Sequence, residues 1–412
     1  MKLIRANKTF RSLFLSRTFN EFGASLFNIV FLVYAAGYPN ATFYISLAAL
    51  TAALPNFLPA FTGFLADKTR DKKRGLFLGS WLQTGLFLLM ALLIGFRSMP
   101  VFLICCLINF VSDLLASYKN GLQMPIIQAH VAAEDTQLAL GTFQGLGSVF
   151  QLVGQPLGVA LLAVFHNSYA GLSLINAVSY FISGLVLLNS RKYLDIDYQP
   201  SEENFQFNFK EIWKNVLSVF EKDGSGNAVS LLIGVLLMNF IANGVLAMIE
   251  LAMKHYNPFG NSYGFAVMLF NLIFSLGILL GSLLMNDFLK NTSIRTILLI
   301  EFVLIIPFAL TLTSFGQIAV IIFFICGYTF SKVNPKFGSY MMEVVSSENL
   351  AKISGSITTL FASCSSIGTI VFIAMANITG VQPTLIFLSI LSMFALIYLS
   401  FFGRKSVKAS LR

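Results

Sequence analysis

The sequence predicts an all-α membrane protein with twelve transmembrane helices arranged as two six-helix halves. Three observations support this prediction. The chain of 412 residues is 56% hydrophobic and only 11% charged, its long apolar runs are separated by short turns, and one long hydrophilic stretch divides it near the middle. Because soluble domains carry about 25% charged residues, a soluble chain of this composition could not cover its surface. A multi-pass protein of the cell membrane is therefore expected.

Twelve apolar runs are long enough to cross a bilayer, for which a helix needs about 20 residues. They predict spans over residues 10–37, 42–66, 75–96, 100–130, 138–165, 169–190, 228–255, 261–287, 293–314, 317–345, 350–378 and 383–403. Gly, Pro and Asn residues between several of these runs favour tight turns. The first run contains Arg17 and Glu21 and is longer than the core of a signal peptide, so it is assigned as a span.

The hydrophilic stretch 191–227 has six predicted spans on either side. Residues 1–190 are therefore predicted to form an N-terminal six-helix half, and residues 228–412 a C-terminal one. Apolar residues between Phe207 and Phe220 recur at helical spacing. This pattern predicts either an amphipathic helix that lies on the cytoplasmic membrane surface or an ordinary linker helix.

Basic residues are concentrated in the segments that connect the spans. The loop between the second and third spans holds Lys68, Arg70, Lys72, Lys73 and Arg74 within seven positions. Membrane proteins retain such clusters in the cytoplasm, and most other Lys and Arg residues fall on the same side of a twelve-span arrangement. Both termini are therefore predicted to be cytoplasmic. The net charge of +9 reflects this topology, so nucleic-acid binding is not expected.

Patterns for catalysis or metal binding are missing from the sequence. The four cysteines lie in apolar runs without a CxxC pair, no histidine stands at ligand spacing, and there is no phosphate-binding P-loop. We therefore expect no enzymatic reaction, no metal, no cofactor and no direct use of ATP.

Ionisable residues inside the predicted spans are the main functional signal, because charges within a bilayer are costly and usually serve a function. Seven of them fall in the first, fourth, seventh and tenth spans: Arg17, Glu21, Asp113, Lys119, Glu250, Lys332 and Lys336. With Asn239 and Asn243, they are the candidate substrate or proton site. Glu301, in the ninth span, is the exception and is interpreted as a buried partner.

The spacing of these residues separates several possibilities. Arg17 and Glu21 are four residues apart, so they can pair on one helix face and serve structure alone. Asn239 and Asn243 share a helix face with Glu250, at spacings of four and seven.

The other two charged pairs are not expected to be self-contained. Asp113 and Lys119 are six residues apart and point in different directions. Lys332 and Lys336 are four apart and repel each other, which requires an acidic group nearby. The candidates for that group are Glu21, Asp113, Glu250 or an anionic part of the substrate.

The basic loop carries Gly63 and Asp67, followed by the cations Lys68, Lys72, Lys73 and Arg74. With the six-plus-six division, it resembles the major facilitator superfamily of transporters, and most closely the drug-efflux branch that includes the macrolide efflux proteins. The resemblance implies a cytoplasmic gate, in which Gly63 allows close helix packing and Asp67 binds the start of the eleventh helix near residues 346–349. The alternative is a charge cluster that only sets topology. The glycine that usually follows the acid is absent here.

The fifth span is similar to the antiporter motif of that superfamily, through Gly147, Gly154, Pro156 and Gly158. The resemblance implies export, and it places the first, fourth, seventh and tenth helices around a central cavity. The alternative is an ordinary kinked membrane helix. Asp113 stands where the family often carries an arginine implicated in proton coupling. This departure leaves a carboxylate that could itself take up a proton.

Together these features predict a monomeric secondary transporter that works by alternating access and is driven by the proton gradient. The expected function is proton-coupled efflux of amphipathic or lipophilic small molecules, similar to drugs or macrolides. Two alternatives remain: a lipid or lysolipid flippase of the same fold, and a membrane receptor or scaffold that transports nothing.

Overall fold

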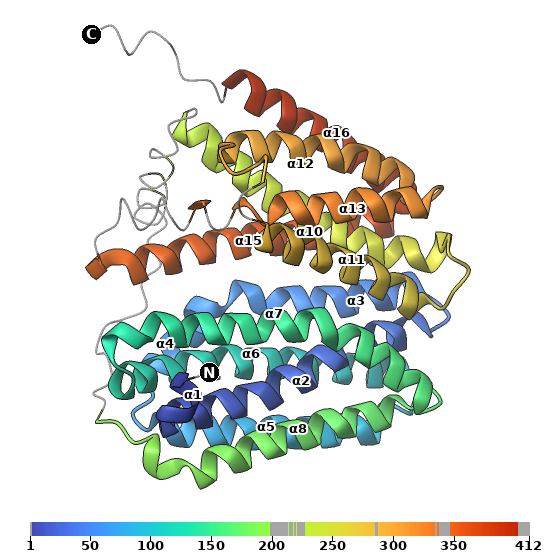
Figure 1. The fold of residues 1–412 in the computed structure, drawn as a ribbon. Helices are drawn as coiled ribbons and strands as arrows, with labels where there is room; N and C mark the ends of the chain where they lie inside the picture. Colours follow the sequence, from blue (N-terminus) through green and yellow to red (C-terminus); the bar gives the residue numbers. More distant parts are fainter. Residues whose placement is uncertain are drawn as a thin grey trace, which may run out of the picture. The chain divides into compact units, whose positions relative to one another are not determined.

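The computed structural model describes residues 2–197, 213, 217, 220, 227–284, 287–333, 336–337 and 347–402. These residues form helices and no β-strand, which confirms the all-α prediction for this part of the chain. The chain divides into two compact units, residues 1–205 and 206–412. Within each unit the long helices run side by side (Figure 1).

The helices of the N-terminal unit follow the predicted spans with one break. They are α1 (Lys2–Ala6), α2 (Lys8–Ala36), α3 (Ala41–Ala53), η1 (Leu54–Phe57), α4 (Pro59–Lys68), α5 (Lys72–Leu93), α6 (Met99–His130), α7 (Ala133–Val164), α8 (Tyr169–Asn189) and η2 (Arg191–Tyr193). The predicted second span is divided by η1, and its two parts are bent by 53° relative to each other. Pro55 and Pro59 flank the bend, and each lacks the backbone N–H that a continuous helix needs.

Two glycines of the antiporter-like segment allow close packing of α7 against α2. A Cβ added to Gly158 would lie 2.6 Å from the backbone oxygen of Leu26, and one added to Gly154 would also overlap α2. By contrast, a Cβ added to Gly147 would meet no described atom within 4 Å. The α7 helix continues through Pro156. Close packing in this segment therefore depends on Gly154 and Gly158.

The C-terminal unit contains α10 (Ala228–Tyr256), α11 (Tyr263–Leu283), α12 (Ile294–Thr311), α13 (Gly316–Phe330), α15 (Ser347–Thr379) and α16 (Val381–Phe402). The α10 helix packs on α15, α11 packs on α13, and α12 packs on both α13 and α16. The α13 helix ends at Phe330, well before residue 345, where the sequence predicts the end of the tenth span. Residues 338–346 lie outside the described residues.

The described helices establish a multi-pass membrane protein. Ten of them are long and apolar enough to cross a bilayer, or eleven if α3 and α4 form one bent span, and α13 is a shorter apolar helix. The count of twelve and the cytoplasmic location of both termini remain predictions. Most of the predicted linker 191–227 lies outside the described residues. Its described members Trp213, Leu217 and Phe220 have helical backbone, and the Phe220 ring centroid lies 5.1 Å from that of Phe337.

Candidate functional site

A pair of opposite charges lies on α2 in the N-terminal unit. Arg17 Nε and Glu21 Oε1 are 3.4 Å apart, one helical turn from each other. The Arg17 guanidinium also lies 4.9 Å from the ring centre of Phe143 on α7. Both charged side chains are half-buried. The structure thus contains the pair that the four-residue spacing allows, and each partner offsets the cost of burying the other.

Lys119 is buried where α5, α6 and α8 meet. Its Nζ donates a hydrogen bond to Ser80 Oγ at 3.2 Å and lies 5.5 Å from the ring centre of Tyr180. Gly79 provides room for this side chain, since a Cβ added there would lie 3.1 Å from Lys119 Cδ. Glu21 is within electrostatic range of the ammonium group. Lys119 is therefore held among polar and aromatic side chains inside the unit.

Asp113 lies on α6, like Lys119, but forms no ion pair with it in the described part of the chain. Its neighbour Ser112 accepts hydrogen bonds from Gln83 Nε2 through its backbone oxygen at 2.9 Å and its hydroxyl at 3.1 Å. Asn176 on α8 is buried, and its amide oxygen and nitrogen have no hydrogen-bond partner among the described residues. Buried polar atoms of this kind mark a polar interior that a ligand or water can satisfy.

The polar residues of α10 make different local contacts. Asn239 Nδ2 donates to Val235 O at 2.9 Å, and Asn243 Nδ2 donates to Asn239 O at 3.1 Å, so both amides bond to their own helix. Glu250 lies near the hydroxyl of Tyr263 on α11. Its buried Oε2 atom has no hydrogen-bond partner among the described residues. The structure therefore places the acid and the amides in different surroundings, although they share a helix.

An apolar cavity of about 160 Å³ lies inside the C-terminal unit, between α10, α11, α12 and α13. Its walls include Asn243, Phe274, Glu301, Phe308, Phe323 and Phe330. The ring centroid of Phe323 is 4.6 Å from that of Phe274 and 5.0 Å from that of Phe308. Glu301 is buried and accepts a hydrogen bond from the Thr329 hydroxyl. Among the described lining residues, Glu301 is thus the only carboxylate, and most of the others are aliphatic or aromatic.

This cavity was not found from the sequence. The sequence indicated that Glu301 is a buried partner but not which residue it contacts. In the structure it accepts a hydrogen bond from Thr329. The aromatic walls could not be recognised because the chain has 42 phenylalanines and most apolar helix positions meet lipid or core. The one usable signal was an acid inside an apolar span.

Lys332 and Lys336 lie beyond the end of α13, against the segment between α11 and α12. Lys332 Nζ donates to two backbone oxygens at the end of α11, at 2.6 and 2.7 Å, and lies 2.9 Å from Asp287 Oδ2. Lys336 Nζ donates to the backbone oxygens of Leu289, Lys290 and Thr292. Burial acts to raise the pKa of Asp287, but hydrogen bonds from Tyr328 and Lys332 outweigh it and hold the pKa below its usual range.

This geometry gives Lys332 an acidic partner that the spacing of the charged residues did not indicate. Within the C-terminal unit, the acid beside Lys332 is Asp287, not Glu250. The two lysines lie after Phe330, the last residue of α13. Asp287 was missed because it is the last residue of a predicted span, and an acidic residue at the end of a span does not by itself indicate a function.

The glycine and the acid of the gate motif lie on α4. A Cβ added to Gly63 would meet no described atom within 4 Å, whereas one added to Gly121 on α6 would lie 2.7 Å from Ala66 Cβ. The close approach of α4 and α6 thus depends on Gly121. The Asp67 side chain is exposed. Its expected partner near residues 346–349 has no described side chains, so this latch remains a prediction.

The cations of the gate motif make different contacts. Lys72 is only 1% exposed, and its Nζ donates to the last backbone oxygens of α4 at 2.5 and 3.3 Å. Lys68 Nζ lies 4.6 Å from the ring centre of Phe64. Arg74 is in the first turn of α5, where its backbone N–H donates to Asp71 Oδ1 at 3.0 Å. Lys72 therefore orders the loop from within, while the other two remain exposed.

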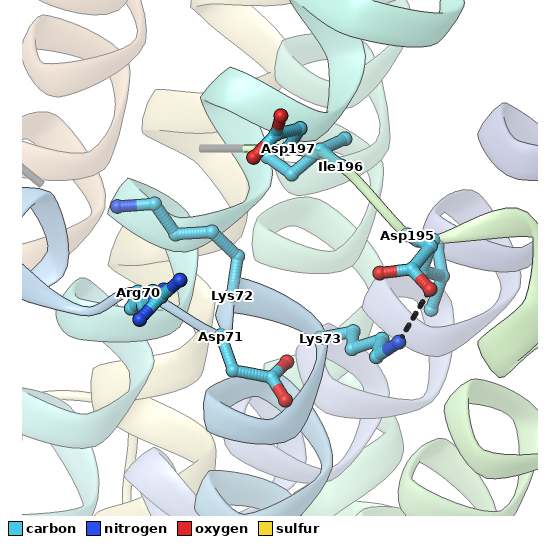
Figure 2. Close-up of a pocket in the computed structure, with 8 residues that line it drawn as sticks. Arg70, Asp71, Lys72, Lys73, Asp195, Ile196 and Asp197 are labelled. Atoms are coloured by element: carbon cyan, nitrogen blue, oxygen red, sulfur yellow. Dashed lines mark ion pairs between the residues drawn. The ribbon is translucent and has the colours of Figure 1, made fainter. Parts of the chain in front are cut away.

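A polar cavity of about 340 Å³ lies between this loop and the segment that follows η2 (Figure 2). Figure 2 shows Lys73 directed at Asp195, and the two form an ion pair of 2.7 Å. The cavity is lined by three cations, three carboxylates and two apolar residues: Arg70, Asp71, Lys72, Lys73, Leu194, Asp195, Ile196 and Asp197. Because opposite charges balance within it, the cavity favours no ion of either sign.

Comparisons with known proteins provide a family and a fold. The sequence model of the Major Facilitator Superfamily matches residues 13–371. No curated protein sequence matches the chain. A POT family transporter in complex with 5-aminolevulinic acid is similar over 96% of this chain and 96% of its own, with 14% identity and a TM-score of 0.68.

Two further solved structures show the same architecture. Peptide transporter POT in complex with sulfate is similar over 95% of this chain and 93% of its own, with 13% identity and a TM-score of 0.65. A mutant of nucleoside transporter NupG is similar over 95% of this chain and 100% of its own, with 16% identity and a TM-score of 0.65. At such identities the similarity establishes the fold alone.

Proposed function

Because the chain belongs to the Major Facilitator Superfamily, we propose that it is a secondary transporter that exports amphipathic or lipophilic small molecules across the cell membrane in exchange for protons. In this proposal the protein is a monomer, works by alternating access and is driven by the proton gradient. The observation that carries the proposal is the apolar cavity of the C-terminal unit, with Glu301 on its wall.

The size and the lining of that cavity favour a lipophilic group. A dry cavity of about 150 Å³ lined by apolar side chains is large enough to bind benzene. The cavity here, about 160 Å³, matches one aromatic ring or a branched alkyl group of a substrate. Its phenylalanine walls offer apolar contact and ring faces that attract a cation.

The carboxylate links substrate binding to proton binding. A carboxylate that faces an apolar space binds either a proton or a cationic group, because each of them neutralises the same negative charge. Binding of one therefore favours release of the other, which is the exchange that an antiporter needs. Glu21 and Asp113 in the N-terminal unit are further acids that could exchange protons during the same cycle.

The structural neighbours and the packing of α7 bear on substrate and direction. The neighbours include transporters of peptides and of nucleosides, which are polar molecules. The apolar walls of the cavity favour a different, lipophilic substrate. Close contact of Gly154 and Gly158 with α2 agrees with the tight packing implied by the antiporter-like motif, and so supports export.

The lipid-flippase alternative has little support from the lysine pair. Lys332 and Lys336 donate to backbone oxygens, and Lys332 also pairs with Asp287. A phosphate headgroup would have to displace these contacts. We therefore keep small-molecule export as the proposed function.

Inverted membrane vesicles provide the test. The parent protein should accumulate a fluorescent lipophilic cation when a proton gradient is imposed, and a protonophore should abolish this uptake. Glu301→Gln keeps the size of the side chain but removes its charge. It should lower uptake about tenfold, as expected when a charge-assisted contact of about 1.5 kcal/mol is lost.

Leu310→Ala is the matched control, because Leu310 lies on α12 like Glu301 but is exposed and does not line the cavity. It should transport at the parent rate. Parent-level uptake by Glu301→Gln would exclude this acid from the mechanism. Uptake that persists after the gradient is collapsed would exclude proton coupling.

A further inference from the structure

A third cavity, of about 260 Å³, lies where the start of α2 meets the end of α8 in the N-terminal unit. The two helix ends lie at the same end of the bundle (Figure 1). The polar residues that line it are Lys8, Arg11, Ser12, Asn189, Ser190 and Tyr193. The Thr9 hydroxyl donates to the Tyr193 backbone oxygen at 2.6 Å, which holds the two walls together.

The described lining of the cavity carries a net positive charge. Lys8 and Arg11 are exposed and lie three residues apart on α2, so their side chains are neighbours. The Lys8 ammonium lies 5.3 Å from the ring centre of Tyr193. Among the described residues, no acidic side chain lines the cavity and neither cation forms an ion pair. The cavity of Figure 2 differs, since three carboxylates balance its cations.

An apolar surface continues from the cations along α2. Leu15 lies one turn beyond Arg11, lines the cavity and is 41% exposed. Val186 on α8 lines the same side. Both helices are apolar and long enough to span a membrane, so this surface leads from a helix end into the hydrocarbon region. Cations at the end of a span, followed by an open apolar face, match a molecule with an anionic head and an acyl chain.

We propose that this cavity binds the phosphate headgroup of an anionic phospholipid, in the leaflet that contains the N-terminus, with an acyl chain along Leu15. Lys8 and Arg11 contact the phosphate, and Asn189 and Ser190 offer further hydrogen bonds from the opposite wall. The inference concerns a separate part of the protein from the transport cavity. It rests only on the spans and on the charges around this pocket.

The test uses the full-length protein, purified in a neutral detergent. Native mass spectrometry measures its affinity for a short-chain phosphatidylglycerol, for phosphatidylcholine of the same chain length and for inorganic phosphate. Phosphatidylglycerol should bind most tightly. The double variant Lys8→Gln/Arg11→Gln should weaken its binding about twentyfold, because each cation near an anionic headgroup contributes about fivefold.

Two variants separate a defined site from diffuse charge. Arg191→Gln/Lys192→Gln removes the same charge from exposed residues outside the lining, at the same end of the unit, and should keep the parent affinity. Lys8→Arg/Arg11→Lys keeps both charges and should also bind. If the double variant does not fold, Arg11→Gln alone should show about a fivefold loss.

Three results would overturn the proposal. Equal losses in the two glutamine double variants would indicate only general attraction to positive charge. Equal affinity for phosphatidylcholine would exclude recognition of the anionic headgroup. Inorganic phosphate that binds as tightly as phosphatidylglycerol, with the same dependence on Lys8 and Arg11, would identify a soluble anion as the ligand.

Discussion

In each unit a buried lysine donates hydrogen bonds to the carbonyl oxygens at the end of a helix. The two lysines differ in how far they lie along the chain from the helix that they cap. In the N-terminal unit, Lys72 caps α4 from only a few residues further along the chain. In the C-terminal unit, Lys332 caps α11 from beyond α13, 51 residues from Gly281. The last carbonyl groups of a helix lack hydrogen-bond partners and carry partial negative charge. An ammonium group donates the missing hydrogen bonds and neutralises part of that charge.

The two loops also differ in what a tyrosine of the neighbouring helix contacts. In the N-terminal unit the Tyr118 hydroxyl on α6 bonds with the Thr69 hydroxyl at 2.7 Å. In the C-terminal unit the Tyr328 hydroxyl on α13 donates to Asp287, which also pairs with Lys332. A neutral contact in one unit thus corresponds to one with a charged group in the other. We expect the ionic version to contribute more to stability and to depend on pH.

The largest expected effect comes from removing the two capping lysines. Lys332→Met should lower the free energy of unfolding by about 3 kcal/mol, because it removes charge-assisted hydrogen bonds to two carbonyl oxygens and leaves a partly buried carboxylate without its cation. Asp287 is only 12% exposed there. Lys72→Met should lower it by about 1.5 kcal/mol, the loss of charge-assisted hydrogen bonds to carbonyl groups. Thermal unfolding midpoints in one detergent provide the measurement.

A second substitution identifies the cause of the larger loss. Asp287→Asn in the Lys332→Met background removes the unpaired charge and keeps an acceptor for Tyr328, so it should recover part of the stability. Lys290→Met changes an exposed lysine of the same loop and should leave the midpoint unchanged. If Lys72→Met and Lys332→Met lowered the unfolding midpoint equally, the ion pair between Lys332 and Asp287 would add nothing to stability.

A smaller difference is expected at the glycines beside the two tyrosines. A Cβ on Gly281 would overlap the backbone oxygen of Tyr328, which moves only if α13 moves. A Cβ on Gly75 would lie 2.7 Å from Leu122 Cδ1, a methyl group that can rotate away. Gly281→Ala should therefore cost about 2 kcal/mol. Gly75→Ala should be near neutral, since alanine favours a helix over glycine by about 1 kcal/mol.

The same unfolding assay measures both alanine variants. Leu122→Ala combined with Gly75→Ala tests the explanation, because the shorter side chain removes the contact. If Gly75→Ala destabilised the protein as much as Gly281→Ala, the distinction between side-chain and backbone contact would be wrong.

The helices were largely predictable because apolar runs and membrane thickness constrain them together. Residues 100–130 were predicted as a span, and α6 covers Met99–His130. The end of α13 was not predicted, although the polar residues Ser331 and Lys332 directly follow Phe330, because the predicted span was extended across them to residue 345. The break between α3 and α4 was missed although Pro55 and Pro59 lie there, because a proline in an apolar run can also be accommodated within a continuous helix.

The candidate site was predictable only where the contacts are local. Arg17 and Glu21 were expected as a pair because helix geometry brings residues four apart together. The contact between Lys332 and Asp287 joins residues far apart in the sequence, so no spacing rule indicates it. The walls of the Glu301 cavity come from four helices, and their convergence depends on helix packing that a single sequence does not specify.

The smallest expected effect is the pH dependence of the C-terminal loop. Burial opposes ionisation of Asp287, but hydrogen bonds from Tyr328 and Lys332 dominate and lower its pKa. A carboxyl group with a lowered pKa contributes stability that is complete above its unfolded pKa and is lost as pH falls through its folded pKa. The parent should therefore exceed Asp287→Asn in unfolding midpoint by a constant amount between about pH 7 and 5, and by less below about pH 4. A margin that stays constant or grows on acidification would show that the backbone oxygens alone hold Lys332, which would make the C-terminal cap equivalent to the N-terminal one.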